Sequence, residues 1–434
     1  MDRFSLIVLF VLGTSLAHAA ATSTSTGKSA PAVLTWAEAV RRTENDNPDI
    51  VSARESLRSA EGKKLAAYSG FLPAVGLDVG YEITERSGSS TVASVTGTGW
   101  TAGVSTDWNL FAGFLDDAKL KRAEADRRAA EEGLRMTRAK TSSDLKSAFE
   151  TVAYARDYTK LTAQILKRRE ENFRLVQLRY ESGRENKGSV LLSEAYLEQA
   201  RLDDLQARNA LRTSSAGLAR VLAVDGDGTA AIEVSGNVPV SEPPKSMPDF
   251  EALVLMTPDY AQAVEQAKSL EEARRVARAA FSPTVDLASR LRRRDEHFFP
   301  TETQTHALEL TLSIPLFNGG KDMGTYRAAA AAASSAEYTR DNTIRETRRK
   351  LEETWAKYTE SVARLRTDES FKKAASVRSE IGRAKYNNGL LSFDDWDVIE
   401  NDLISREKTL LETRRDRATA EAAWELAQGK GVWP

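Results

Sequence analysis

The sequence contains no cysteine among its 434 residues and only three histidines. The absence of cysteine excludes disulfide bonds, thiolate chemistry and thioether-linked lipid anchors. His297 and His306 do not have the spacing of two metal ligands on one helix, and His18 lies in a segment that we expect to be removed. The sequence therefore predicts no metal centre and no bound cofactor.

Recognisable catalytic motifs are missing from the sequence as well. It has no glycine-rich loop for phosphate, no nucleophile turn and no cluster of metal-binding side chains. These absences argue against an enzyme. If the protein takes part in transport, the energy must come from a partner.

The sequence has neither a large excess of charge nor a long apolar run. Its net charge of −2 gives no electrostatic reason to expect nucleic acid as a partner. Residues 1–21 combine a short apolar core with the cleavage pattern AHA at residues 17–19, which is typical of a secretory signal peptide. No apolar segment reaches the ~20 residues that a membrane-spanning helix requires. We therefore expect an exported protein without a transmembrane helix.

An internal repeat organises the rest of the chain. Residues 108–113 (WNLFAG) recur as residues 314–319 (IPLFNG), and residues 180–183 (YESG) recur as residues 386–389 (YNNG). The separation is 206 positions in both cases. Such a repeat predicts two halves with the same architecture. We assign the first half to residues 35–224 and the second to 250–434, with a flexible tail at 22–34 and a proline-containing linker at 225–249.

Each half contains a segment of period two. Residues 73–110 and 283–316 alternate apolar with small or polar side chains, and each segment predicts a β-hairpin. The strands of about ten residues match the ~9–11 residues of a tilted membrane strand. The first hairpin is expected to turn at residues 86–90.

Long helices are expected after each hairpin, at about 114–222 and 320–427. Residues 114–180 contain no proline, and a continuous helix of that length would be on the order of 100 Å long. Trp396, Leu403 and Leu410 recur every seven residues, which predicts a coiled-coil seam. Helix is also expected before each hairpin, including residues 250–281.

Four membrane strands per chain cannot stand alone. An open sheet edge in lipid leaves amide groups without partners, and four strands cannot enclose a pore. Several chains must then share one barrel, and the charged helices must extend into water. The alternative is a small soluble sheet packed on a helical bundle.

These features resemble the TolC-like outer membrane efflux proteins. The residues that carry the resemblance are the two LFxG junctions, the two YxxG turns, and residues 71–73 (FLP) with their second copy at 281–283 (FSP). The resemblance implies a mainly α-helical fold with a transmembrane β-barrel part. It further implies a homotrimer, a twelve-stranded barrel and a coiled-coil tunnel through the periplasm. The implied partners are outer membrane lipid, a periplasmic adaptor and an inner-membrane RND or ABC transporter, in efflux or type I secretion.

The resemblance also points to residues at the periplasmic entrance. Tyr386 matches a tyrosine that helps to hold the closed state, and Asp395 matches the first position of an acidic pair. The second position would fall on Val398. Leu391 stands where an arginine partner is often found, and the turn at residues 183–188 carries no matching aspartate.

Asp394, Asp395 and Asp397 are the candidates for gating or cation selection. Asp394 and Asp397 are three residues apart and so share a helical face, and threefold symmetry would turn each into a ring of carboxylates. The alternative is structural, because Ser392 with Asp395 resembles a capping pair and carboxylates favour a helix N-terminus.

Two further groups belong to the predicted hairpins. Trp100 and Trp108 are candidates for the aromatic girdle at the membrane interface, with core packing as the alternative. Arg290 and the run 292–294 are candidates to bind phosphates of outer-leaflet lipid, with a solvated loop as the alternative.

Three functions remain open from sequence. The first is a passive conduit docked to an energised pump, and the second is a stand-alone diffusion porin, although a porin needs no helices of ~100 Å. The third is a soluble periplasmic coiled-coil adaptor, although an adaptor needs no membrane strands. In the family that the chain resembles, cargo choice lies mostly with the inner-membrane partner.

Overall fold

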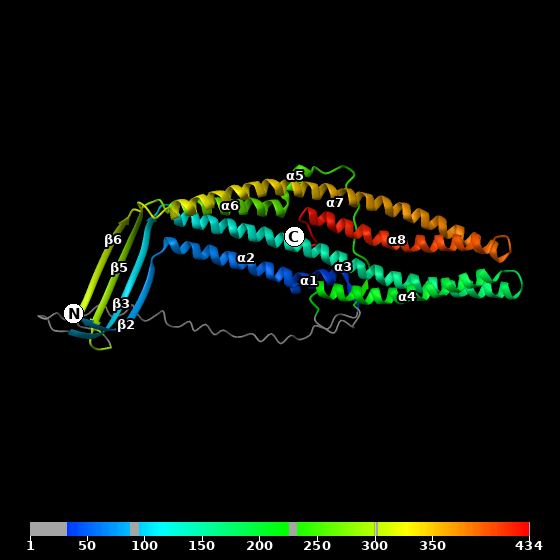
Figure 1. The fold of residues 1–434 in the computed structure, drawn as a ribbon, viewed down its shortest axis with the longest axis horizontal. Helices are drawn as coiled ribbons and strands as arrows, with labels where there is room; N and C mark the ends of the chain where they lie inside the picture. Colours follow the sequence, from blue (N-terminus) through cyan, green and yellow to red (C-terminus); the bar gives the residue numbers. More distant parts are fainter. Residues whose placement is uncertain (1–32, 87–94, 225–231, 299, 301–302, 434) are drawn as a thin grey trace.

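The chain folds into an elongated molecule, with a β-sheet at one end and helical hairpins that reach away from it (Figure 1). The structure, a computed structural model, describes residues 33–86, 95–224, 232–298, 300 and 303–433. The predicted signal peptide, nearly all of the predicted tail, most of the turn predicted at 86–90 and the first part of the predicted linker lie outside these residues.

Four antiparallel strands form the sheet, in the order β2-β3-β5-β6. Strand β2 (Ala74–Arg86) pairs with β3 (Val95–Ala112) in the first half, and β5 (Thr284–Asp295) pairs with β6 (Thr303–Ser313) in the second. Strand β3 also pairs with β5, so the two hairpins join side by side. Strands β2 and β6 each have one neighbour, and the sheet of a single chain is open at both edges.

The two faces of the sheet differ in chemistry. One face carries large apolar side chains that stay exposed in a single chain, with Leu77 and Leu308 at 75% and 76% exposure. The opposite face carries glycine, threonine, serine and charged residues. Exposed apolar area of this extent marks a surface that contacts lipid or another protein.

The strand ends depart from the sequence prediction. Strand β6 ends at Ser313 rather than at residue 316, since Pro315 cannot donate to a strand ladder. Strand β3 continues to Ala112, with a register shift between Asn109 and Phe111. Such a bulge bends a strand, here at the point where the sheet leads into a helix.

Glycine explains the repeated junction between sheet and helix. Gly113 and its repeat counterpart Gly319 have φ +64° and φ +60°, and each lies two residues before a long helix. The next residue is also left-handed, Phe114 at φ +63° in the first copy and Gly320 at φ +80° in the second. This conformation costs glycine little and phenylalanine more. At Gly113 a Cβ would also lie 2.2 Å from the Cβ of Ser282, so the site excludes larger residues on two grounds.

Two helices of 67 residues each, α3 (Leu115–Glu181) and α7 (Lys321–Asn387), run the length of the molecule. Shorter helices lie end to end beside them, α2 (Pro48–Ala67) and α4 (Lys187–Val221) along α3, and α6 (Pro258–Ala279) and α8 (Phe393–Ala427) along α7 (Figure 1). At ~1.5 Å per residue the long helices measure about 100 Å. A short 3₁₀ turn at Tyr68–Phe71 connects α2 to β2.

The middle of the molecule holds a small mixed region. Strand β1 (Val33–Thr35) pairs in parallel with β4 (Glu233–Ser235), near helix α1 (Trp36–Asp46). Leu34 is fully buried in the same apolar cluster as Trp433, so both ends of the described chain pack together. The tail predicted to run to residue 34 is therefore ordered at its last two residues.

The helix predicted at 250–281 is divided. Helix α5 (Phe250–Met256) ends at Met256 with Thr257 as its cap, and α6 begins at Pro258 and ends at Ala279. The division follows from Pro258, which disfavours helical backbone at the residue before it and opens a new helix well.

Candidate functional site

The end of the molecule opposite the sheet is formed by two helical hairpins, α3–α4 and α7–α8 (Figure 1). Each turn begins with a left-handed glycine, Gly183 at φ +71° and Gly389 at φ +76°. Their amides bond to the carbonyl oxygens of Tyr180 and Tyr386, as in the usual glycine termination of helices. Helix α4 begins at Lys187 with Asn186 as its cap, so Gly188 lies within the helix and not in the turn.

Tyr386 lies at the centre of the contact between the two hairpin tips. Its side chain is fully buried and stacks on Trp396 of α8, with ring centroids 4.3 Å apart and planes 8° apart. The Arg179 guanidinium of α3 lies 4.4 Å from the centroid of the Tyr386 ring and also donates to the Tyr386 carbonyl oxygen. An aromatic ring held by a cation and a second ring fixes the spacing of the hairpins.

The Tyr386 hydroxyl extends the contact to the other turn. It donates a hydrogen bond of 3.1 Å to the carboxylate of Glu185. Burial and the nearby Glu185 charge raise the pKa of Tyr386 well above its usual range. The phenol therefore stays protonated, and the donor is present, at every physiological pH.

Asp397 is buried between the hairpins. Its carboxylate lies 3.6 Å from the Arg169 guanidinium of α3 and accepts a hydrogen bond of 2.9 Å from Asn401. Arg169 also donates to Asn401 and lies 4.6 Å from the centroid of the Tyr196 ring. Burial raises the pKa of Asp397, although Tyr196 and Arg169 oppose the shift. Burial likewise lowers the pKa of Arg169.

The other two candidate aspartates are exposed and differ in their contacts. The Ser392 hydroxyl accepts from the Asp395 amide at 3.1 Å and donates to its carboxylate at 2.7 Å, which is the reciprocal cap of helix α8. Asp394 points to the surface in the first turn of α8. The structure thus separates Asp394 and Asp397, which share a helical face in sequence but differ in burial.

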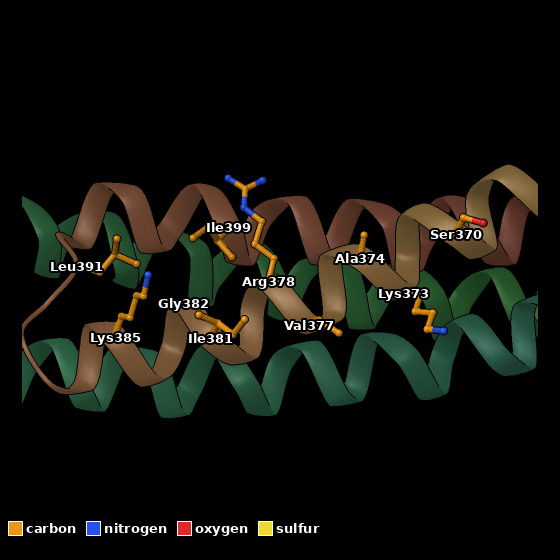
Figure 2. Close-up of a pocket in the computed structure, with 10 residues that line it drawn as sticks. All are labelled: Ser370, Lys373, Ala374, Val377, Arg378, Ile381, Gly382, Lys385, Leu391 and Ile399. Atoms are coloured by element: carbon orange, nitrogen blue, oxygen red, sulfur yellow. The ribbon is translucent and has the colours of Figure 1, made fainter.

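A groove of about 710 Å³ lies on α7 near this tip. Figure 2 shows that nearly all of its lining comes from α7, with Leu391 and Ile399 from the following turn and α8. Val377 and Ile381 are about half exposed there. The lining residues are Ser370, Lys373, Ala374, Val377, Arg378, Ile381, Gly382, Lys385, Leu391 and Ile399.

The two candidate interface tryptophans lie on the apolar face of β3. Trp100 packs against Tyr81 and Phe298, at centroid distances of 5.0 and 4.7 Å. Trp108 is 39% exposed, and its indole N–H donates to the carbonyl oxygen of Phe71 at 3.2 Å. Eight residues separate the two rings, about 26 Å along a strand, close to the ~25 Å apolar band of an outer membrane barrel.

The arginines of β5 do not share one face. The register places Arg290, Arg292 and Arg294 on the polar face, and Arg293 alone among them on the apolar face. The four arginines therefore cannot act together on one face, and the prediction that they bind lipid phosphate stays a prediction. The period of two in the strand divides a run that looks continuous in sequence.

Among the described residues, no helix has the length and apolar character needed to cross a bilayer. Within the same residues, no group of three or more acidic or histidine side chains is arranged to hold a metal ion.

A family model described as outer membrane efflux protein matches residues 39–224 and 253–430, which is most of the chain. The chain belongs to this family. The resemblance inferred from the repeated junctions is confirmed. Membership makes the protein an outer membrane channel of the efflux and secretion type.

Three curated relatives of the chain carry different descriptions. The chain is 22% identical to the probable outer membrane lipoprotein SilC of Salmonella typhimurium over 72% of this chain and 69% of SilC. It is 30% identical to protein CyaE of Bordetella pertussis over 62% of this chain and 56% of CyaE. It is 24% identical to the alkaline protease secretion protein AprF of Pseudomonas aeruginosa, over 51% of this chain and 47% of AprF. The match spans only about half of the CyaE and AprF chains.

Solved structures show the same fold. The outer membrane protein VceC of Vibrio cholerae superposes with a TM-score of 0.82 at 20% identity, over 91% of this chain and 96% of VceC. The outer membrane channel CmeC of Campylobacter jejuni gives a TM-score of 0.83 at 14% identity, over 91% of this chain and 85% of CmeC.

Sequence reasoning missed the partners of Tyr386. The acid comes from Glu185, in the turn between α3 and α4, and the arginine comes from Arg179 instead of position 391. The charged run RENK at 184–187 was the one available signal for Glu185. No pattern within α3 distinguishes Arg179 from its many charged neighbours.

Proposed function

We propose that three copies of the chain close a twelve-stranded barrel in the outer membrane, continued by a coiled-coil helical tunnel through the periplasm. The protein gives a passive exit path to substrates delivered by an inner-membrane RND or ABC transporter through a periplasmic adaptor. The open sheet carries this proposal. Its edge strands β2 and β6 have unpaired backbone groups, and its apolar face is exposed. In lipid both defects disappear only when neighbouring copies complete the cylinder.

The groove on α7 supports assembly with a second copy of the chain. Its apolar floor is flanked by Lys373, Arg378 and Lys385. Helix α4 carries exposed leucines, including Leu202 and Leu205, together with several acidic residues. Helix α4 and the groove of α7 are therefore complementary in both apolarity and charge.

The entrance lies at the hairpin tips, where Tyr386 holds α7 against α3. The contacts of Tyr386 with Arg179 and Glu185 support a role in the closed state. Asp394 is the best candidate for the ring of carboxylates, because its side chain is exposed and does not cap helix α8. Asp395 and Asp397 act mainly through the cap and the buried ion pair, and so position the tip.

The relatives support both kinds of partner system. The name of AprF describes protein secretion, and the family description names efflux. SilC is described as a lipoprotein, whereas this chain has no cysteine to carry such a lipid. A stand-alone porin would leave two helices of 67 residues without a purpose, and a soluble adaptor would leave the apolar sheet face in water.

Cysteine cross-linking tests the assembly, because the chain contains no native cysteine. One copy carries Val377→Cys in the groove of α7, and a differently tagged copy carries Leu202→Cys or Leu205→Cys on α4. We expect oxidation of co-expressed copies to give a product that contains both tags. Phe371→Cys combined with Leu65→Cys, on exposed sites at opposite halves of the molecule, serves as the matched control.

Three results would contradict the proposal. The first is extraction of the protein without detergent, the second is a single-chain species in detergent, and the third is a lack of conductance in planar bilayers. An adaptor would give the first of these, and a soluble sheet packed on helices would give all three.

A further inference from the structure

Most charges on the polar face of the sheet lie in two zones, and Glu82 lies outside both, one row beyond Arg294 toward the turns. Pairing across strands defines rows of residues that lie side by side on this face. Near the helices, two successive rows hold the carboxylates Asp286, Asp107 and Glu309. The next three rows toward the turns hold Arg290, Arg292 and Arg294, with Asp78 as the one carboxylate among the side chains of those rows.

The arginines form a straight column along β5. They are two residues apart, so the column is about 13 Å long at ~3.3 Å per residue. Arg290 begins the column and lies 3.6 Å from Asp107 and 3.5 Å from Glu309, both of which belong to the acidic zone. All of these side chains are exposed in the single chain, with Arg290 at 51%. Ion pairs of this kind are loose and screened, so the charges remain available to ions in the pore.

Glycines on β3 leave room for the column. A Cβ on Gly103 would lie 2.9 Å from the Asp78 carboxylate and 3.0 Å from the Leu291 carbonyl oxygen. A Cβ on Gly99 would lie 3.3 Å from the Arg294 side chain. The absence of side chains at Gly99 and Gly103 lets the charged groups lie flat over the sheet, at the surface that would face the pore.

We propose that the turn-side half of the barrel lumen is an anion-binding zone formed by Arg290, Arg292 and Arg294. The inference rests on the proposed trimer, which would place three such columns around one pore. Rings of arginine are the usual device of anion and phosphate pores, and low-dielectric walls concentrate their field. The ligand class is a compact polyanion that carries phosphate or several carboxylates. The acidic zone beneath makes the lumen bipolar.

Block of single-channel current tests the proposal. Purified full-length protein is added to one side of a planar bilayer, where its charged helices remain. Inositol hexakisphosphate, a compact polyanion, is added to the opposite side, which faces the strand turns. We expect block that strengthens as that side is made negative and weakens with added salt. In the variant R290Q/R292Q/R294Q, the half-blocking concentration should rise by about tenfold or more.

Arg293→Gln is the matched control. Arg293 lies in the same strand and between two members of the column, but the register places it on the apolar face. Its substitution should leave the half-blocking concentration unchanged within about twofold. The proposal is overturned if the triple variant and Arg293→Gln are blocked like the parent protein. It is also overturned if hexaamminecobalt(III), a compact trication, blocks from the turn side and the polyanion does not. A lack of any conductance would instead reject the proposed channel assembly.

Discussion

The Tyr386 hydroxyl donates a hydrogen bond of 3.1 Å to the carboxylate of Glu185, across two helical hairpins that lie 201 positions apart in sequence. The Arg179 guanidinium and the Trp396 ring both pack against the Tyr386 ring. Few groups thus hold the two hairpin tips together, and a single substitution can weaken their contact.

Tyr386→Phe is expected to loosen the tip. The variant keeps the stacked ring and loses one hydrogen bond to a carboxylate, worth about 1.5–3 kcal/mol. Open events in planar bilayers should increase by about tenfold or more, since ~1.4 kcal/mol corresponds to tenfold. Tyr338→Phe is the control, because Tyr338 is on the same helix and 74% exposed. Equal behaviour of the two variants would contradict a role for the hydroxyl.

The stability of the protein should decline at alkaline pH partly through Tyr386. Its pKa is raised by burial, so the folded state keeps a proton that the unfolded state loses near pH 10. The stabilisation is complete below pH 10 and is lost as pH rises toward the folded pKa, by about 1.4 kcal/mol per pH unit. Thermal unfolding followed by circular dichroism from pH 9 to 11.5 should show a shallower decline in Tyr386→Phe. Tyr154, whose pKa is raised to about 12 by burial, contributes to the decline in both proteins.

Arg169→Met is expected to destabilise the contact between hairpins. The substitution leaves Asp397 buried without its cation, and the loss of one partner of a buried ion pair costs about 3–5 kcal/mol. The midpoint of thermal unfolding in detergent should fall. The double variant Arg169→Met/Asp397→Leu should recover much of the loss, because neither charge remains buried. A double variant less stable than Arg169→Met would contradict this account.

Cation selectivity should depend on Asp394 more than on Asp395. Asp394→Asn removes three exposed charges from the proposed entrance of a trimer, and the reversal potential in a KCl gradient should shift toward lower cation preference. Asp395→Asn weakens the cap of α8, which affects stability by about 0.5–2 kcal/mol. If both variants keep the parent's selectivity and divalent block, no ring is present at this end.

Tryptophan fluorescence can locate the membrane band. In lipids brominated near the ester groups, Trp100→Phe and Trp108→Phe should each reduce the quenching of the reconstituted protein, because we propose that those rings lie at the two edges of the apolar band. Trp396→Phe is the control, since that ring is buried at the far tip. Quenching that depends on Trp396 and on neither of the other two would contradict the assignment.

The regular elements could be predicted because their periods are simple. Strand β2 carries an uninterrupted alternation from Val75 to Ile83, and the break between α1 and α2 follows from Asn47-Pro48, with Asn47 as the cap. Strands β1 and β4 have three residues each, which is too short for any period to appear. Pro258 indicates a helix break, but the helical pattern on both sides of it favoured the prediction of one continuous helix.

The tip could be predicted only in part. The duplicated turn identified Tyr386, and the capping pattern at Ser392 and Asp395 was recognisable from spacing. Burial of Asp397 depends on Arg169, which is 228 positions earlier, and no local pattern reports such a distance. Sequence alone therefore does not distinguish the exposed Asp394 from the buried Asp397, because the difference depends on the neighbouring hairpin.

The cluster that joins Leu34 and Trp433 sits at mid-length and buries more than a dozen side chains, whereas the tip cluster around Tyr386 buries four. Regions with few buried contacts open at low free energy, and densely packed ones remain closed. In the proposed trimer, the hairpin tips could then separate while the densely packed centre and the barrel on its other side keep their structure.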